Sequence, residues 1–204
     1  EKNISIAMDL DGSTGFKYIR DIRSLDDFNG VWNLRINDFE DEFMISSSQM
    51  GPFPEELQVG LVNINERKVL LNFLDHKEVI PNNKNSVYDL KVIAGDQEYV
   101  KSMSQEILSS IPEEFSLGQN YPNPFNPITQ MEYSLPQRSK VVISIYNVLG
   151  QEIKSLINKE QDYGYHSVSW DGTDRLGKSV ASGVYFTQMR SGGFSQSKKM
   201  LLLK

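Results

Sequence analysis

The sequence predicts an all-β protein made of two tandem antiparallel β-sandwiches, the second immunoglobulin-like with about seven strands. Its length of 204 residues leaves room for two domains of about 100 residues each. Apolar and polar residues alternate in short runs along both halves, which is the period of a strand with one buried face. Turn-forming stretches rich in glycine, proline and asparagine separate these runs, and no segment of useful length has a helical period.

The first half of the chain, residues 1–100, is predicted to be a β-sandwich that serves as a spacer or accessory domain. Three of its runs alternate cleanly, and a fourth is more uniformly apolar, as in a buried strand. Strands at this spacing favour a compact antiparallel sandwich. The predicted strands are 32–36, 57–61, 69–74 and 87–93, preceded by one or two strands within 4–10 and 16–22.

Residues 101–114 change character, because small polar residues and a proline replace the alternation. They predict an interdomain linker with room for one helical turn.

The second half, residues 115–204, is again rich in strand patterns, with an extended segment through residues 121–125 as a candidate seventh strand. The six main predicted strands are 130–135, 141–146, 152–157, 165–170, 183–189 and 195–203.

Composition excludes several classes of function. The chain has no cysteine, which rules out disulfides, thiolate metal sites and cysteine nucleophiles. Residues 1–111 hold 11 basic and 19 acidic residues, a net charge of −8, whereas residues 112–204 have a net charge of +2. The acidic half argues against nucleic acid as a partner. No apolar run approaches the roughly 20 residues of a membrane helix, so no transmembrane segment is expected.

A proline-rich block covers residues 120–127, Asn-Tyr-Pro-Asn-Pro-Phe-Asn-Pro. Its three prolines fix φ and restrict the preceding residues to extended conformations, so the block is expected to be stiff and similar to polyproline II. Because it cannot donate a full ladder of hydrogen bonds, it belongs at or beneath a sheet edge. Tyr121 and Phe125 are the expected anchors in the core. Taken alone, the block describes no more than a stiff entry into a domain.

Further sequence motifs follow the proline-rich block in the second half of the chain. Residues 147–150 predict a hairpin in which Gly150 supplies a positive φ. The alternation over 163–170 places His166 and Val168 on one face with Trp170, which is the expected core anchor. The next residues, 170–177, are rich in turn formers, and their aspartates are expected to accept backbone hydrogen bonds. A Gly-Val-Tyr-Phe strand entry at 183–186 and a Lys-Lys-Met-Leu-Leu-Leu-Lys ending complete the series.

In this order the blocks closely resemble the type A C-terminal sorting domain of the type IX secretion system of Bacteroidetes-like bacteria. The resemblance covers residues 115–204. The Trp-Asp-Gly and Gly-Val-Tyr blocks are also similar to the immunoglobulin-like domain of flagellar hook-capping proteins, which supports the sandwich fold. The residues that carry the sorting resemblance are Tyr121, Pro122, Asn123, Pro124, Phe125, Asn126, Gly150, Trp170, Asp171, Gly172, Gly183, Val184, Tyr185, Lys198, Lys199, Met200, Leu201, Leu202, Leu203 and Lys204.

The resemblance implies a module that directs an upstream passenger domain across the outer membrane to the cell surface or the medium. Its implied partners are the translocon and shuttle proteins of the type IX system and a sortase-like signal peptidase of the outer membrane. The peptidase is expected to cut in the linker just before the domain, around residues 103–112. We expect the exporter to contact edge strands, above all the last one. Because residues 1–20 lack the features of a signal peptide, the signal and the passenger are expected upstream of Glu1.

Two rival functions come from other classes. A cell-surface adhesion or glycan-binding module would present exposed aromatic side chains, for which Trp32, Phe39, Phe43 and Phe53 are the candidates, although the alternation places Trp32 in the core. A hook-cap-like assembly protein would need flagellar sequence upstream.

Catalytic and metal-binding patterns are weak. His76 and His166 stand apart, with no partners at ligand spacing. Residues 9–13 resemble the start of a calcium loop, but Arg20 occupies the twelfth position, where such a loop needs a bidentate glutamate. The acidic run 38–42 has no basic or metal-binding partner in the sequence. No phosphate loop, nucleophile elbow or zinc-protease motif is present. We therefore expect no enzymatic activity and no cofactor.

Overall fold

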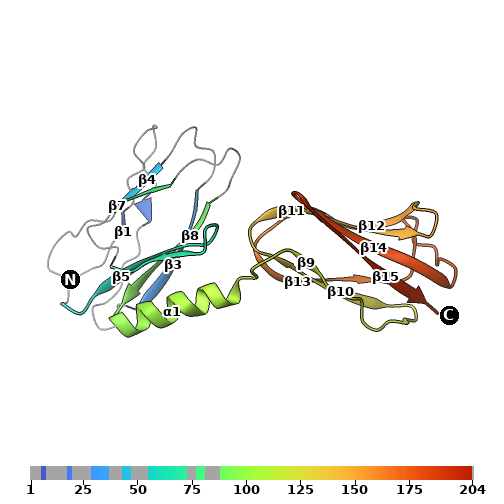
Figure 1. Cartoon of the computed structure of the whole chain (residues 1–204), viewed down its shortest axis with the longest axis horizontal. Helices are drawn as coiled ribbons and strands as arrows, with labels where there is room; N and C mark the ends of the chain where they lie inside the picture. The colour runs from blue at the N-terminus through green and yellow to red at the C-terminus, as the bar shows by residue number, and fades with distance from the viewer. Residues whose placement is uncertain are drawn as a thin grey trace. The chain divides into compact units, whose positions relative to one another are not determined.

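The protein divides into two compact units, Glu1–Ser109 (unit 1) and Ser110–Lys204 (unit 2). Each is built of antiparallel strands, and the described residues hold one helix (Figure 1). The predicted all-β fold class is therefore confirmed. The computed structural model describes residues 6–7, 18–19, 29–36, 43–46, 55–72, 77–80 and 88–203.

The main sheet of unit 1 has four strands in the order β3-β8-β5-β6. Trp32 on β3 is 8% exposed, so its predicted place in the core is confirmed. The strand expected over 69–74 is shorter than predicted, because β6 ends at Leu70 and Leu71 is 49% exposed. The strands are β3 (Gly30–Ile36), β5 (Gln58–Asn63), β6 (Lys68–Leu70) and β8 (Tyr88–Gly95), with the separate pairs β1 (Ile6–Ala7) with β2 (Tyr18–Ile19) and β4 (Phe43–Ser46) with β7 (Lys77–Ile80).

Helix α1 (Gln97–Ser110) occupies most of the segment that was expected to be a linker, and that prediction was wrong. Val100, Ser104 and Ile107 are buried, and their spacing of four and three residues is the period of one helix face. Asp96 caps the helix, because its carboxylate accepts the Tyr99 N–H at 2.7 Å. The polar Ser104 on the buried face obscured the helical period in the sequence.

Gly60 on β5 allows α1 to approach the sheet closely. A Cβ at this position would lie 2.8 Å from Cγ1 of Val100, which is inside van der Waals contact. We therefore expect Gly60→Ala to lower the free energy of unfolding of unit 1 by about 1–3 kcal/mol through overpacking. Urea unfolding followed by circular dichroism measures the change. Gly193→Ala is a control in unit 2, because a Cβ there meets nothing within 4 Å, and it should leave the unfolding of unit 1 unchanged. An unchanged stability of unit 1 in Gly60→Ala would contradict the close packing.

Unit 2 is a sandwich of a four-stranded sheet, β12-β11-β14-β15, and a three-stranded sheet, β13-β10-β9. All six main strands predicted for this half are present. Their inward side chains form one core that includes Trp170, Tyr185, Met200 and Leu202. The strands are β9 (Ser116–Leu117), β10 (Thr129–Leu135), β11 (Ser139–Asn147), β12 (Glu152–Gln161), β13 (Gly164–Trp170), β14 (Gly183–Ser191) and β15 (Phe194–Leu202).

The seventh strand is β9 and not the proline-rich block, so the prediction for residues 121–125 was wrong. The block makes only two isolated bridges, from Tyr121 to Gln130 and from Phe125 to Leu202. Phe125 is 2% exposed, as expected of a core anchor, but Tyr121 is 83% exposed. The backbone of Tyr121 pairs with Gln130 in both directions, at 2.8 and 3.0 Å, which holds the residue while its side chain faces solvent.

Candidate functional site

The sequence blocks come together at one end of unit 2, which we call the block end. The segment before β10, the β11–β12 hairpin, the β13–β14 connection and the last residues of β15 all lie there, at the end that carries the C-terminus label (Figure 1). The β10–β11, β12–β13 and β14–β15 turns lie at the opposite end. Segments far apart in the sequence therefore share one end of the sandwich.

The proline-rich block runs along the outer edge of β15. The Phe125 N–H donates to the Leu201 carbonyl at 3.0 Å, and the Leu203 N–H donates to the Phe125 carbonyl at 2.9 Å. The Asn123 side chain accepts the Leu201 N–H at 3.0 Å. The block thus extends the sheet by a short parallel bridge between Phe125 and Leu202. Because prolines have no backbone N–H to donate, the Asn123 side chain takes part in the pairing.

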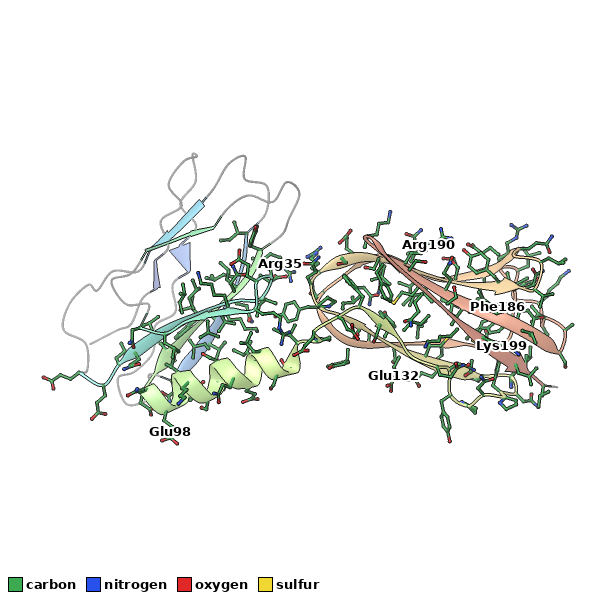
Figure 2. All side chains as sticks on the ribbon, in the orientation of Figure 1. Arg35, Glu98, Glu132, Phe186, Arg190 and Lys199 are labelled. Carbon is green, nitrogen blue, oxygen red and sulfur yellow. The ribbon has the colours of Figure 1, made fainter. Side chains whose placement is uncertain are left out.

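This contact changes what the last strand can offer a partner. The Lys199 carbonyl accepts hydrogen bonds from Gln119 at 2.8 Å and from Asn123 at 3.4 Å. Residues 199–202 of β15 and the following Leu203 are therefore not a free edge. The Lys199 side chain stays exposed and lies opposite Phe186 of β14 in the sheet register (Figure 2). A partner would reach this part of the strand through side chains.

A buried polar network closes the proline-rich block, and the sequence analysis missed it. Asn120 is 2% exposed and Thr129 is 1% exposed. The Asn120 amide donates to the Pro122 carbonyl at 3.0 Å and to the Thr129 hydroxyl at 2.9 Å. The Thr129 hydroxyl in turn donates to the Pro122 carbonyl at 2.8 Å. An asparagine just before a proline-rich turn was the available signal, because its side chain can satisfy carbonyls that have no ladder partner.

Three aromatic side chains from three different blocks pack together beneath the block end. The Trp170 ring lies 5.5 Å from Phe125 and 5.1 Å from Tyr185, the latter in an edge-to-face arrangement. Trp170 is 1% exposed and its indole N–H donates to the Thr173 carbonyl at 2.9 Å. Edge-to-face pairs add to the stabilisation from burial. The aromatic cluster therefore couples the proline-rich block to the β13–β14 connection.

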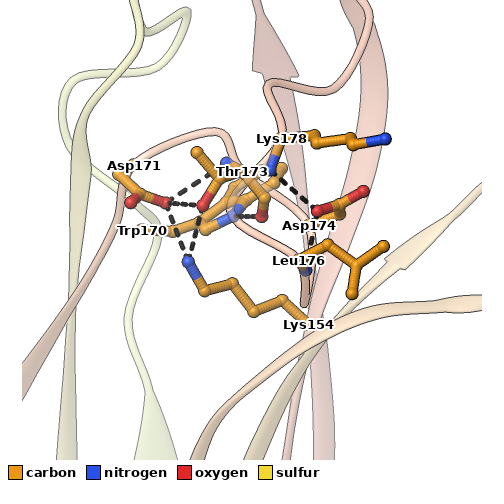
Figure 3. A network of polar contacts seen from close by, with 7 residues as sticks. All are labelled: Lys154, Trp170, Asp171, Thr173, Asp174, Leu176 and Lys178. Atoms are coloured by element: carbon orange, nitrogen blue, oxygen red, sulfur yellow. Dashed lines mark hydrogen bonds and ion pairs between the residues drawn. The ribbon is translucent and has the colours of Figure 1, made fainter.

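The connection after Trp170 is held by a polar network (Figure 3). The Asp171 carboxylate accepts the Thr173 hydroxyl at 2.6 Å and the Lys154 ammonium at 3.0 Å. Lys154 also donates to the Thr173 hydroxyl at 2.6 Å. The carboxylate of Asp174 accepts two backbone N–H groups of the same loop. The predicted capping by both aspartates is confirmed, and Lys154 of β12 fastens the loop to the neighbouring sheet.

The network makes the carboxyl of Asp171 more acidic. The Thr173 hydroxyl, aided by Lys154 and the Thr173 backbone, lowers the pKa of Asp171 from its ordinary value of 3.8 to about 2. Because the folded-state pKa lies below the unfolded one, ionised Asp171 stabilises the loop above pH 3.8, and this contribution is lost as the pH falls through 2. We expect Thr173→Val to raise the pKa of Asp171, as measured by NMR titration of its side-chain carboxyl carbon. An unchanged titration would contradict the network.

The remaining block residues divide between turns and surface. Gly150 adopts a φ of +75°, as the hairpin pattern predicted. Gly172 has a φ of +68°, and a Cβ there would lie 3.2 Å from the Pro127 carbonyl, so this glycine permits close approach of two blocks. Lys204 lies outside the described residues. Block residues with exposed side chains are Tyr121, Pro122, Asn123, Pro124, Asn126, Asp171, Lys199 and Leu203, whereas Val184, Lys198 and Leu201 are half-buried.

The alternative sites gain no support. The His166 ring stacks on Tyr133 with centroids 5.3 Å apart, and its Nε2 lies 2.9 Å from the Asp162 carbonyl, so it packs as an ordinary strand residue. Within the described residues, no group of three or more histidine, cysteine or acidic side chains is placed to hold a metal ion. His76, residues 9–13 and the run 38–42 lie outside those residues, as do Phe39, Phe53 and the side chain of Phe43.

Comparisons with known proteins point to the fold of unit 2. Residues 128–193 match the FlgD Ig-like domain family. The chain matches no curated protein. No helix among the described residues is long and apolar enough to cross a membrane.

Two solved structures from Porphyromonas gingivalis are similar to the chain. One is PorZ, described as an essential bacterial surface component of the type-IX secretion system. Its sequence is 15% identical to this chain, the match covers 55% of this chain and 14% of PorZ, and the TM-score is 0.31. The other is dimeric latent PorU, with 14% identity, 93% of this chain and 22% of that chain covered, and a TM-score of 0.36. The chain therefore spans less than a quarter of either protein, and at these TM-scores neither likeness carries an argument. What the comparisons establish is an immunoglobulin-like body at residues 128–193.

Proposed function

We propose that unit 2 is a type A C-terminal sorting domain of the type IX secretion system, which directs an upstream passenger across the outer membrane to the cell surface or the medium. One observation carries the proposal. The proline-rich block and β15, which are joined by hydrogen bonds at residues 123, 125, 201 and 203, both lie outside the matched immunoglobulin-like range of 128–193. The matched range therefore leaves out two segments of unit 2 that are bonded to each other.

These two segments hold the first and the last of the blocks that resemble the sorting family, whereas the blocks around Gly150, Trp170 and Tyr185 lie within the matched range. The exposed side chains of the proline-rich block and of Lys199 and Leu203 lie on one end of a rigid sandwich, which suits recognition of a folded signal. The partners in this account are the translocon and shuttle proteins, and the module needs no catalytic residue or cofactor. Unit 1 acts as a spacer between the passenger and the signal.

The proposed removal of the signal is placed differently from the expectation based on sequence. Residues 103–110 belong to helix α1, in which Ser104 and Ile107 are buried, and proteases prefer exposed irregular segments. Glu113 and Glu114 follow the helix and are exposed. A sortase-like peptidase is therefore expected to cut near these two glutamates.

A gain-of-function experiment tests the proposal. Residues 110–204 are fused behind a periplasmic signal peptide and a fluorescent reporter in a bacterium that possesses the type IX system. We expect the reporter to become accessible to external protease and antibody, while the same reporter without residues 110–204 stays in the periplasm. Retention of both proteins in the periplasm would overturn the proposal. A host that lacks the translocon is the second control, and it should retain the fusion.

A further inference from the structure

Two turns at the block end are built in the same way. In the first, the Asn147 side-chain oxygen accepts the N–H groups of Leu149 and Gln151, each at 3.0 Å. The Asn147 backbone pairs with Gly150 at 3.0 Å and with Gln151 at 3.1 Å, and Gly150 has a φ of +75°. The turn is thus closed on both sides of Leu149, whose side chain is 77% exposed.

The second turn repeats every one of these features. The Asp174 carboxylate accepts the N–H groups of Leu176 and Lys178 at 2.8 and 2.9 Å. The Asp174 backbone pairs with Gly177 at 3.1 Å and with Lys178 at 2.8 Å, and Gly177 has a φ of +76°. Leu176 takes the place of Leu149 and is 73% exposed. We call residues 147–151 and 174–178 the leucine turns.

The leucine turns are fastened to one another through the start of β12. The Arg175 N–H donates to the Ile153 carbonyl at 3.1 Å, and Lys154 donates to both Asp171 and Thr173 (Figure 3). The second turn is therefore held against the strand that leaves the first turn. Both leucines therefore belong to turns that are tied to the first residues of β12.

The fold does not need leucine at these positions. The turn requires the asparagine or aspartate and the glycine, because these supply the side-chain acceptor and the positive φ; a polar residue would serve equally between them. Single exposed leucines are ordinary, but neighbouring exposed apolar side chains mark interaction sites. Val148 in the first turn adds a further apolar side chain that is 67% exposed. Leucines on rigid turns lose little conformational entropy on binding.

The charges around the leucine turns favour a protein over a lipid surface. Glu152, Asp171 and Asp174 are acidic, and Lys154, Arg175 and Lys178 are basic. A balanced rim gives no net attraction to anionic headgroups, which recruit clusters of basic residues. A fixed pair of apolar side chains within mixed charges matches instead the anatomy of a protein interface, with apolar anchors inside a polar rim.

We propose that the two leucine turns form one docking surface for a protein, and that Leu149 and Leu176 enter an apolar recess on it. The inference rests on the proposed function, since the partner is a component of the export route that receives the folded signal. Asn147 and Asp174 are positioning residues that hold the turns in shape.

Surface delivery of the full 204-residue chain, carried behind a periplasmic signal peptide and a reporter, tests the docking surface. Leu149→Gln and Leu176→Gln keep side-chain size and are combined in one chain. Removal of two anchor residues is expected to reduce delivery about tenfold or more, and each single substitution several-fold. Tyr165→Gln is the matched control, because Tyr165 is also 73% exposed but lies on β13; it should deliver like the wild type.

Two further measurements separate the possible occupants. Thermal melting of each purified variant should match the wild type, since exposed substitutions scarcely change stability; if the double variant melts early, Leu149→Ser with Leu176→Ser replaces it. Flotation with phosphatidylcholine–phosphatidylglycerol vesicles should show no leucine-dependent binding, and sedimentation should show a monomer. Leucine-dependent flotation or dimerisation would overturn the proposal in favour of a lipid or a second copy.

The delivery assay also distinguishes this inference from the function on which it rests. If the wild-type chain is not delivered, the sorting function itself fails. If the wild type is delivered and a stably folded double leucine variant is delivered equally, the docking surface alone is refuted.

Discussion

Trp170→Ala is expected to lower the free energy of unfolding of unit 2 by about 3–5 kcal/mol. Trp170 is 1% exposed, packs against Phe125 and Tyr185, and donates a hydrogen bond to the Thr173 carbonyl. The substitution removes the side chain on which three sequence blocks meet. A domain of this size has a total stability of about 5–15 kcal/mol, so the variant should be close to unfolding at growth temperature.

Urea unfolding of residues 110–204, followed by circular dichroism, measures this effect without relying on tryptophan fluorescence. Tyr165→Ala is the control, because Tyr165 is 73% exposed and its loss should change stability by no more than about 0.5 kcal/mol. If Trp170→Ala were as mild as the control, the aromatic cluster would not be the centre of the unit 2 core. Delivery of a Trp170→Ala fusion should fall together with its folded fraction.

Deleting residues 198–204 is expected to abolish the cooperative folding of unit 2. Met200 and Leu202 are both fully buried, and the loss of each such side chain costs about 2–5 kcal/mol. The deletion also removes the acceptors and donors that hold Asn123 and Phe125. The amide NMR spectrum of residues 110–197 should therefore lose its dispersion. A dispersed, native-like spectrum would contradict the role given to β15.

Because this deletion unfolds the unit, its effect on export cannot by itself separate folding from recognition. Lys199→Ser and Leu203→Ser change exposed side chains at the end of β15 and leave the core intact. If the exporter contacts the last strand, this pair should reduce surface delivery while the melting temperature stays unchanged. Ser195→Ala, an exposed position nearer the other end of β15, provides the comparison on the same strand.

The strands of unit 2 could be predicted because each has a local signature. The alternation over 163–170 identified β13 and placed Trp170 inward, and the glycine of the 147–150 turn identified the hairpin. These features depend on neighbours in sequence. The same holds for Trp32 in unit 1, whose alternation correctly placed it in the core.

What could not be predicted depends on contacts between distant residues. Tyr121 and Phe125 look equivalent in the sequence, but only Phe125 faces inward. The backbone of each is held by a different segment, Tyr121 by Gln130 and Phe125 by Leu201 and Leu203. The pairing of the proline-rich block with the edge of β15 could not be predicted either, because it joins residues about 80 positions apart in the sequence. Helix α1 was missed because its buried face includes Ser104, a polar residue that satisfies its hydroxyl on the Val100 carbonyl within the helix.

The most direct test of the account replaces residues 110–204 with an unrelated immunoglobulin-like sandwich of the same length. The fusion retains the reporter, the periplasmic signal peptide and residues 1–109. If the exporter reads the particular end of unit 2 that the sequence blocks build, the exchanged protein should fold but remain in the periplasm. Surface delivery equal to that of the native fusion would show that any sandwich suffices and would contradict the sorting role of unit 2.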